Sequence, residues 1–272
     1  MIEQQTQQIS DASTMLEHEV KAPIIETVGL SKTYYLGSEM VTPVTDVTLQ
    51  VGYGDLAVIF GQSGAGKSTL LNMLMGLEPP DLGEVFLKGS SLYDYSEENR
   101  ALIRRKKISY LPQNQYWLDH LNMVENVALP LLLNGTGRIK ALSQATEMLK
   151  DFGLGSRLKH KPDELSTGQQ QKAALARAMI KNPWLIFADE PTAHLDTKSV
   201  EEVTEILLDA VNSKGATVIM VTHDFDYLKL SKKWFFMRDG RLWDIEDHRS
   251  PLNDIKDALA YVDKLEVEGR ST

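Results

Sequence analysis

The sequence of 272 residues contains no cysteine. Disulfides, thiolate metal sites and cysteine nucleophiles are therefore excluded, and the composition suits a reducing compartment. The sequence also lacks a long apolar run. The best candidate, residues 127–133, is interrupted by Pro130 and falls well short of the roughly 20 residues that a membrane-spanning helix needs. We therefore expect any role at a membrane to depend on a partner protein.

Basic residues are fewer than acidic residues, 29 Lys and Arg against 38 Asp and Glu, so the formal net charge is -9. This balance argues against a surface that coats nucleic acid, and we expect no nucleic-acid partner. The first 16 residues are polar and acidic and do not resemble a signal peptide, so we expect a cytoplasmic protein. The hydrophobic content of 42% and the charged content of 25% are those of an ordinary globular chain that can bury a sizeable core.

Short apolar runs typical of β-strands recur from Ile24 onward, and several of them are continuously apolar, as strands covered on both faces are. They are residues 24–28, 44–51, 56–60, 85–87, 108–111, 184–188 and 217–221. Between the last two, apolar residues from Val200 to Val211 recur at helical spacing. Strand, helix and strand in that order predict a right-handed parallel crossover and an α/β fold.

The remaining stretches suggest the domain organisation. Residues 1–22 are polar and predict a tail without a core, and residues 23–248 form the main domain. Within it, residues from about 115 to 181 carry helical patterns, including 139–152, and predict an inserted helical lobe. Asp239-Gly240 between two apolar runs predicts a tight hairpin. Residues 249–272 predict a polar helical tail.

A phosphate-binding loop follows the apolar run 56–60. The sequence GQSGAGKST fits the pattern G-x-x-x-x-G-K-[ST] and is followed by a helical run, which is the context that the motif requires. Glycines let the backbone direct N–H groups at phosphate oxygens, and the helix adds its positive end. We expect Lys67 to reach the β- and γ-phosphates and Ser68 to ligate Mg²⁺. The residues expected around the nucleotide are Gly61, Gln62, Ser63, Gly64, Ala65, Gly66, Lys67, Ser68 and Thr69.

Two carboxylates end the apolar run 184–188, at the edge where a parallel sheet binds ligands. We expect Asp189 to hold Mg²⁺ through water and Glu190 to polarise the water that attacks the γ-phosphate. His223 ends the next strand, where it could contact the γ-phosphate and keep the attacking water in register. Gln113, just after the run 108–111, is placed to supply a further oxygen ligand to Mg²⁺. The alternative is that each of these residues only caps a helix or lies in a loop and has no catalytic role.

The segment LSTGQQQKAALARAMIKNP, residues 165–183, resembles the signature motif of the ABC ATPase family, and six spaced motifs occur in the family's order from Ile24 to about Ile245. The resemblance implies a P-loop NTPase fold with a mixed core sheet, an antiparallel β-subdomain and a helical lobe. It also implies an ATPase that uses ATP and Mg²⁺, releases ADP and forms an ATP-dependent head-to-tail homodimer. By resemblance, Tyr34 stacks on adenine, Gln113 lies in the Q-loop, residues 193–196 form the D-loop and His223 is the switch histidine. The signature residues Ser166, Thr167, Gly168 and Gln169 then cover the γ-phosphate of the second copy.

Two residues depart from the family pattern, because glycine is usual where Thr167 stands and asparagine is common where His194 stands. If position 167 needed a positive φ, threonine would cost about 1 kcal/mol or more there and slow the closure of the dimer.

Several runs, including Glu125-Asn126-Val127-Ala128-Leu129-Pro130, most resemble the subgroup of macrolide-export, lipoprotein-release and FtsE cell-division ATPases. This implies an integral membrane permease as partner, with or without a periplasmic adaptor, and a location on the inner face of the cell membrane. Residues 116–118 are expected either to help form the groove for a cytoplasmic helix of that partner or to pack within the helical lobe.

Two other functions fit parts of the pattern. The first is an FtsE-like regulatory ATP switch that controls a membrane or cell-wall partner, which would keep the same residues. The second is a soluble ATPase of the DNA-repair type. This type needs a long coiled coil between the phosphate loop and the signature, where the present sequence has only the helical lobe. The leading interpretation is an ATP-hydrolysing subunit that powers a membrane permease in export, lipoprotein release or mechanotransmission.

Overall fold

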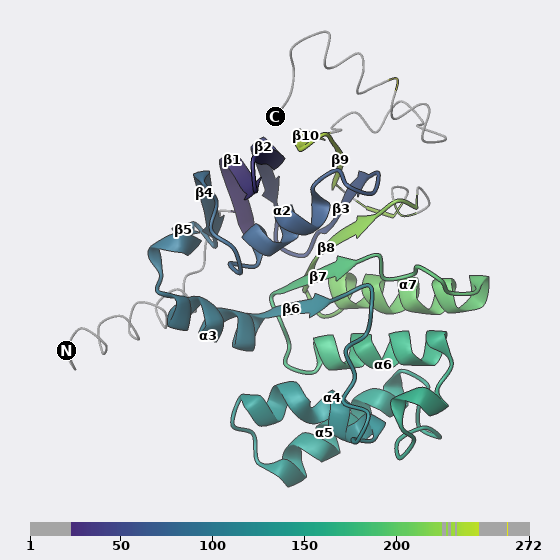
Figure 1. The fold of residues 1–272 in the computed structure, drawn as a ribbon. Coiled ribbons are helices and arrows are strands. Elements are labelled where there is room, and N and C mark those ends of the chain that lie inside the picture. The colour runs from purple at the N-terminus through teal and green to yellow at the C-terminus, as the bar shows by residue number, and fades with distance from the viewer. Residues whose placement is uncertain (1–22, 225–226, 228–229, 232, 245–259, 261–272) are drawn as a thin grey trace, which may run out of the picture. The chain divides into compact units, whose positions relative to one another are not determined.

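The computed structural model describes residues 23–224, 227, 230–231, 233–244 and 260. The described residues fall into two compact units (Figure 1). The first contains those up to residue 103 together with those from residue 221 onward, and the second contains residues 104–220. The predicted tails at 1–22 and 249–272 lie outside the described residues, apart from residue 260, so those predictions stay open.

The first unit contains an antiparallel sheet with the strand order β2-β1-β4-β5 (Figure 1). Its strands are β1 (Ile25–Leu36), β2 (Glu39–Val51), β4 (Leu82–Leu87) and β5 (Ser90–Ser91). The central strand β1 pairs with β2 and β4, and Ile25 lies opposite both Val51 and Leu87. Both β1 and β2 are longer than their apolar runs, because residues outside those runs also pair along the β1–β2 ribbon. Tyr34 lies on this extension, opposite Val41.

Strands β10, β9 and β3 are neighbours in the first unit and make a mixed arrangement. Strand β3 (Leu56–Gly61) is buried throughout and runs parallel to β9 (Lys233–Arg238), whereas β10 (Arg241–Asp244) returns antiparallel to β9. The rings of Phe60 and Phe236 stack with centroids 5.8 Å apart and help to hold β3 on β9. The predicted Asp239-Gly240 hairpin is confirmed, since both residues have a positive φ. Helix α2 (Lys67–Leu74) follows β3.

The second unit contains strands in the order β8-β7-β6. Strand β6 (Ile108–Leu111) runs parallel to β7 (Leu185–Asp189), with Leu111 opposite Ala188. Helix α7 (Thr197–Asn212) connects β7 to β8 (Thr217–Thr222), and its apolar stripe is buried at Val203, Leu207 and Ala210. Helix α3 (Glu97–Lys107) precedes β6, and the 3₁₀ turn η1 (Leu92–Asp94) precedes α3.

Three helices occupy the stretch for which the sequence predicted a helical lobe: α4 (Met123–Leu133), α5 (Arg138–Asp151) and α6 (Thr167–Met179). Helix α4 packs on both α5 and α6 (Figure 1). The 3₁₀ turn η2 (Pro162–Glu164) precedes α6. The fully buried Asn126 of α4 bonds through its side chain to the backbone of Leu118, Leu121 and Asn122, and so fixes the segment that leads into α4. Among the described residues, no helix is long and apolar enough to cross a membrane.

Candidate active site

The phosphate loop joins β3 to α2 in the first unit, and two of its glycines have no room for a side chain. Gly66 is the N-cap of α2 with φ 102, and a Cβ there would collide with the carbonyl oxygen of Pro43 and lie 2.9 Å from the Met237 Cε atom. At Gly61, a Cβ would collide with the Met237 carbonyl oxygen. The first turn of α2 carries no acidic residue, so the positive end of its dipole is not neutralised from within. This geometry fits a bound phosphate group.

The Lys67 ammonium group folds back over the loop. Its Nζ donates to the carbonyl oxygens of Gly61 and Gln62, each at 2.7 Å. A triphosphate in the loop would offer this ammonium stronger, charge-assisted acceptors in place of those two neutral carbonyls. Ser68 is exposed and Thr69 is half-buried at the start of the helix.

The β9–β10 hairpin supports the phosphate loop. The Gly240 N–H donates to the Ala65 carbonyl oxygen at 3.2 Å, and the Gly240 carbonyl oxygen accepts from the Thr45 N–H at 2.8 Å. The hairpin turn therefore connects the loop to strand β2. The sequence predicted the turn from Asp239-Gly240 but gave no sign of this second role.

Tyr34 is half-buried near the end of β1. Its hydroxyl donates to the Glu78 carboxylate at 2.6 Å. Burial and the Glu78 carboxylate together raise the pKa of Tyr34 to about 12. The residue predicted to stack on adenine is thus bonded to the segment that follows helix α2.

The two predicted acidic residues lie at the end of β7 in the second unit, as the sequence indicated. Glu190 has φ 48, a left-handed backbone that costs a non-glycine residue free energy and that often marks functional positions. Asp189 accepts from the Tyr110 hydroxyl at 3.3 Å, and burial, followed by the charge of Asp189, raises the pKa of Tyr110 to about 12. Sequence analysis missed Tyr110, although its position on the neighbouring strand β6 places it opposite Phe187.

Gln113 and His223 are both exposed just after strands. Gln113 follows β6 in the second unit, and His223 follows β8 where the chain has returned to the first unit.

The signature residues form a second helix N-terminus, at the start of α6 in the second unit. Ser166 is the N-cap and makes a reciprocal capping box with Gln169, and both Ser166 and Thr167 are exposed. Gly168 is buried, and a Cβ there would lie 2.8 Å from the Cβ atom of Ser199 on α7. Uncapped N–H groups and the helix dipole make such a terminus suited to anions.

The backbone conformation at Thr167 and His194 shows what the two departures from the family pattern cost. Thr167 is the first helical residue of α6 and is absent from the described residues that have a positive φ, so the condition for strain at this position is not met. His194, by contrast, has φ 64. Histidine and asparagine are both enriched among the residues that adopt this left-handed conformation, so histidine can replace the more common asparagine at low cost.

Comparison with known proteins agrees with this geometry. The family model described as "ABC transporter" matches residues 44–193, which is more than half of the chain.

The chain belongs to the ABC transporter family.

Among the relatives of this ABC ATPase is an uncharacterized ABC transporter ATP-binding protein of Methanocaldococcus jannaschii, which is 41% identical over 82% of this chain and 99% of the relative. A lipoprotein-releasing system ATP-binding protein, LolD, from a Shewanella species is 38% identical over 83% of this chain and 97% of its own length. These relatives agree with the predicted subgroup, and the chain is the ATP-binding subunit of an ABC transporter.

Solved structures confirm the predicted ABC ATPase fold. The cassette MJ0796, solved as a dimer in a post-hydrolysis state bound to ADP and phosphate, has a TM-score of 0.74 and 34% identity, over 81% of this chain and 98% of that one. A structure of cbiO1 from Clostridium perfringens, part of the ABC transporter complex cbiONQ, also has a TM-score of 0.74 over 90% of this chain and 96% of its own. At 23% identity, that second likeness concerns the fold alone. The chain is therefore an ATPase of the ABC type.

Proposed function

We propose that two copies of this ABC ATPase close head to tail around two ATP molecules, and that the cycle of closing, hydrolysis and opening drives a separate membrane permease. One observation carries the proposal: a single chain presents two distinct helix N-termini suited to phosphate, one at Gly66–Lys67 and the other at Ser166–Thr167. Ser166 and Thr167 are exposed in the monomer and are available to a nucleotide held by a second copy.

Each site residue takes a role that follows from its chemistry. Lys67 and the loop N–H groups hold the β- and γ-phosphates, and the exposed Ser166 hydroxyl reaches the same γ-phosphate from the other copy. The Glu190 carboxylate orients the attacking water and accepts its proton, and His223 keeps that water in line with the γ-phosphate.

Magnesium fits the oxygen donors that these motifs supply. The Ser68 hydroxyl, the Gln113 amide oxygen and the Asp189 carboxylate are the hard ligands that Mg²⁺ prefers. When bound, the ion neutralises charge on the phosphate oxygens. In the second unit, the Tyr110 hydroxyl holds one oxygen of Asp189 by a hydrogen bond and so orients the carboxylate.

The proposed contact with the permease is the segment that follows Gln113. Tyr116 is 75% exposed and Leu118 is 42% exposed, so both can receive a short cytoplasmic helix. Trp117 instead packs within the second unit, because its Nε1 donates to Gln170 at 3.1 Å and the Arg177 guanidinium lies 4.2 Å from its ring centroid. The likeness to a lipoprotein-releasing ATPase favours export or lipoprotein release at the inner face of the cell membrane, with or without a periplasmic adaptor.

A complementation experiment tests the shared site. One chain carries Lys67→Ala and a second carries Ser166→Glu, which places a negative charge against the γ-phosphate. Alone, each variant forms dimers in which both sites are damaged. When the two are mixed, a head-to-tail dimer contains one site with both defects and one with none, so we expect ATP turnover well above that of either variant alone.

The control is a chain that carries both substitutions, mixed with either single variant. No pairing then restores an intact site, and turnover should stay at the level of the separate proteins. If the two single variants also fail to complement each other, although size-exclusion chromatography shows that they associate, each site is built within one chain and the head-to-tail proposal is wrong.

A further inference from the structure

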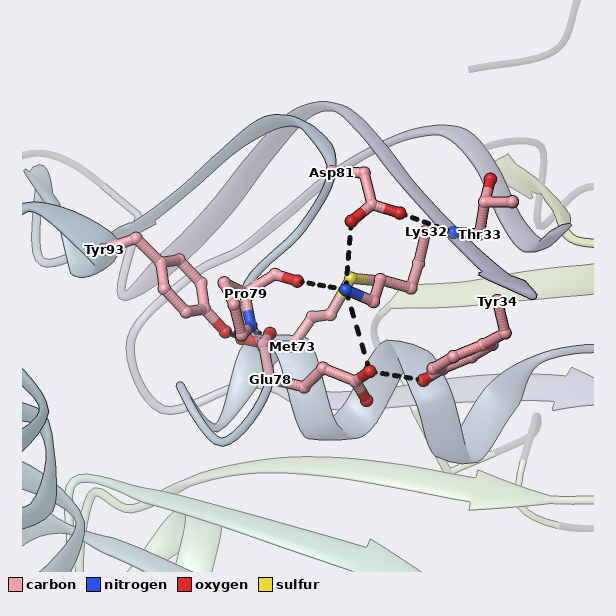
Figure 2. A network of polar contacts seen from close by, with 8 residues as sticks. All are labelled: Lys32, Thr33, Tyr34, Met73, Glu78, Pro79, Asp81 and Tyr93. Atoms are coloured by element: carbon pink, nitrogen blue, oxygen red, sulfur yellow. Dashed lines mark hydrogen bonds and ion pairs between the residues drawn. The ribbon is translucent and has the colours of Figure 1, made fainter. Parts of the chain in front are cut away.

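Strand β1 and the segment after α2 are joined by a polar network within the first unit (Figure 2). The Asp81 carboxylate accepts from the Thr33 N–H at 2.7 Å and from the Lys32 ammonium at 3.1 Å. Lys32 also donates to the Pro79 carbonyl oxygen at 2.9 Å. The Lys32 side chain is only 12% exposed, whereas the Asp81 side chain is 46% exposed, so solvent still screens part of this ion pair.

Glu78 connects this network to Tyr34. Figure 2 shows its carboxylate between the Lys32 ammonium and the Tyr34 hydroxyl. One oxygen, Oε1, lies 3.8 Å from the Lys32 Nζ atom and accepts the Tyr34 hydroxyl at 2.6 Å. The Lys32 Nζ atom also lies 5.8 Å from the centroid of the Tyr34 ring.

The segment that carries Glu78 is itself firmly held. The N–H groups of Leu77 and Glu78 donate to the Asn72 carbonyl oxygen of α2. The Tyr93 hydroxyl donates to the Met73 carbonyl oxygen at 2.8 Å and also contacts that of Glu78. The backbone of Glu78 is therefore anchored to the end of helix α2, and its carboxylate extends from this anchored position.

Lys32, Thr33 and Asp81 already tie the backbone of β1 to the segment after α2 without Tyr34. Strand β1 pairs with β4 through backbone groups, so this pairing does not depend on the hydrogen bond from Tyr34 to Glu78. Its specific effect falls on the aromatic ring, whose rotation about χ1 and χ2 it restricts. The neighbouring Tyr35 is 76% exposed, which illustrates how a tyrosine on this ribbon lies when it faces solvent.

We propose that Glu78, held by Lys32, is a positioning residue that fixes the Tyr34 ring as a preformed platform for the nucleotide base. The inference rests on the proposed function, in which Tyr34 stacks on adenine. A fixed ring loses no rotational freedom when the base binds, so the clamp improves affinity by lowering the entropic cost of stacking.

The test compares two ligands, ATP and inorganic tripolyphosphate, by titration calorimetry on the full chain. Tyr34→Phe keeps the ring and removes the tether, and Glu78→Ala removes the acceptor. Since a hydrogen bond to a charged group is worth more than a neutral one, we expect each variant to weaken ATP binding about three- to tenfold. Tripolyphosphate has no base, so its affinity should not change in either variant.

Two further variants separate positioning from a structural role. Glu78→Gln keeps a neutral acceptor at the same reach and should therefore lose less affinity for ATP than Glu78→Ala. The double variant Tyr34→Phe/Glu78→Ala should bind ATP as well as either single variant, because both remove the same interaction. The matched control is Glu147→Gln, which removes a carboxylate from an exposed ion pair with Lys150 in the second unit.

The outcomes distinguish the clamp from the stacking on which it rests. If Tyr34→Leu weakens ATP binding but Tyr34→Phe and Glu78→Ala do not, stacking holds and the clamp is wrong. Equal losses for ATP and tripolyphosphate would also overturn the clamp, since they would show a general disturbance of the phosphate loop. If Tyr34→Leu leaves ATP affinity intact, the stacking role itself fails, and the clamp fails with it.

Discussion

The replacement of Gly66 by alanine offers a strong test of the phosphate loop, because Gly64 provides a matched control. Both glycines have a positive φ, 102 at Gly66 and 84 at Gly64. A Cβ at Gly64 would meet nothing within 4 Å, whereas one at Gly66 would collide with the carbonyl oxygen of Pro43 and lie 2.9 Å from both the Pro43 carbonyl carbon and the Met237 Cε atom. The pair therefore separates backbone strain from steric collision.

The expected losses follow from these two terms. A left-handed backbone costs alanine about 1–2 kcal/mol, which applies to both variants. Overpacking adds about 1–3 kcal/mol at Gly66 alone. Pro43 lies two residues before Thr45, whose N–H is bonded to the Gly240 carbonyl oxygen, so the Pro43 backbone cannot easily move away from the new Cβ. The smaller entropy of the unfolded chain after a Gly→Ala change is common to both variants and cancels. Gly66→Ala should therefore lose about 1–3 kcal/mol more unfolding free energy than Gly64→Ala.

Guanidinium unfolding followed by tryptophan fluorescence measures both losses, and calorimetry measures the affinity for ATP. We expect Gly66→Ala to lose more affinity than Gly64→Ala, because the collision displaces the N–H groups at the start of α2. Equal losses of stability in the two variants would show that the loop does not approach Pro43 closely, and the reasoning would be refuted.

Three further predictions concern the second unit. Glu190→Gln should bind ATP but hydrolyse it more than about 100-fold more slowly and accumulate as a dimer, as followed by phosphate release and light scattering; normal turnover would mean that Glu190 is not the base. Thr167→Gly should not raise turnover and should lower stability by about 0.5 kcal/mol through weaker helix propensity, and a several-fold increase in ATPase rate would contradict the unstrained geometry at this position. The Lys172 ammonium donates to the Glu202 carboxylate at 2.6 Å and lowers the pKa of Glu202. The ion pair therefore stabilises the fold at pH values above the ordinary carboxyl pKa, and this stabilisation is lost as the pH falls through the lowered pKa of Glu202. Glu202→Gln should therefore be less stable than wild type by less than about 1 kcal/mol near pH 7, with a gap that closes below about pH 4; a gap independent of pH would exclude the ion pair as its cause.

The sequence by itself was sufficient for the local features of this ABC ATPase. Apolar runs predicted every strand from β3 to β8 except the two-residue β5, because a buried strand needs a continuous apolar stretch that can be read from neighbouring residues. The phosphate loop and the signature were recognisable for the same reason, since each places its N–H groups through the conformation of adjacent residues. The hairpin at Asp239-Gly240 likewise follows from the turn that this dipeptide favours.

Contacts between distant residues were decided only by the tertiary structure. Tyr34 and Glu78 are 44 residues apart, and Tyr110 and Asp189 are 79 apart. No periodicity connects such pairs, and many other carboxylates in the sequence could have filled the same role. Backbone conformation at Thr167 and His194 was also open, because each φ depends on the helix or turn into which the surrounding chain packs. Sequence names the residues that carry the chemistry, while side-chain packing selects the partners that hold them in place.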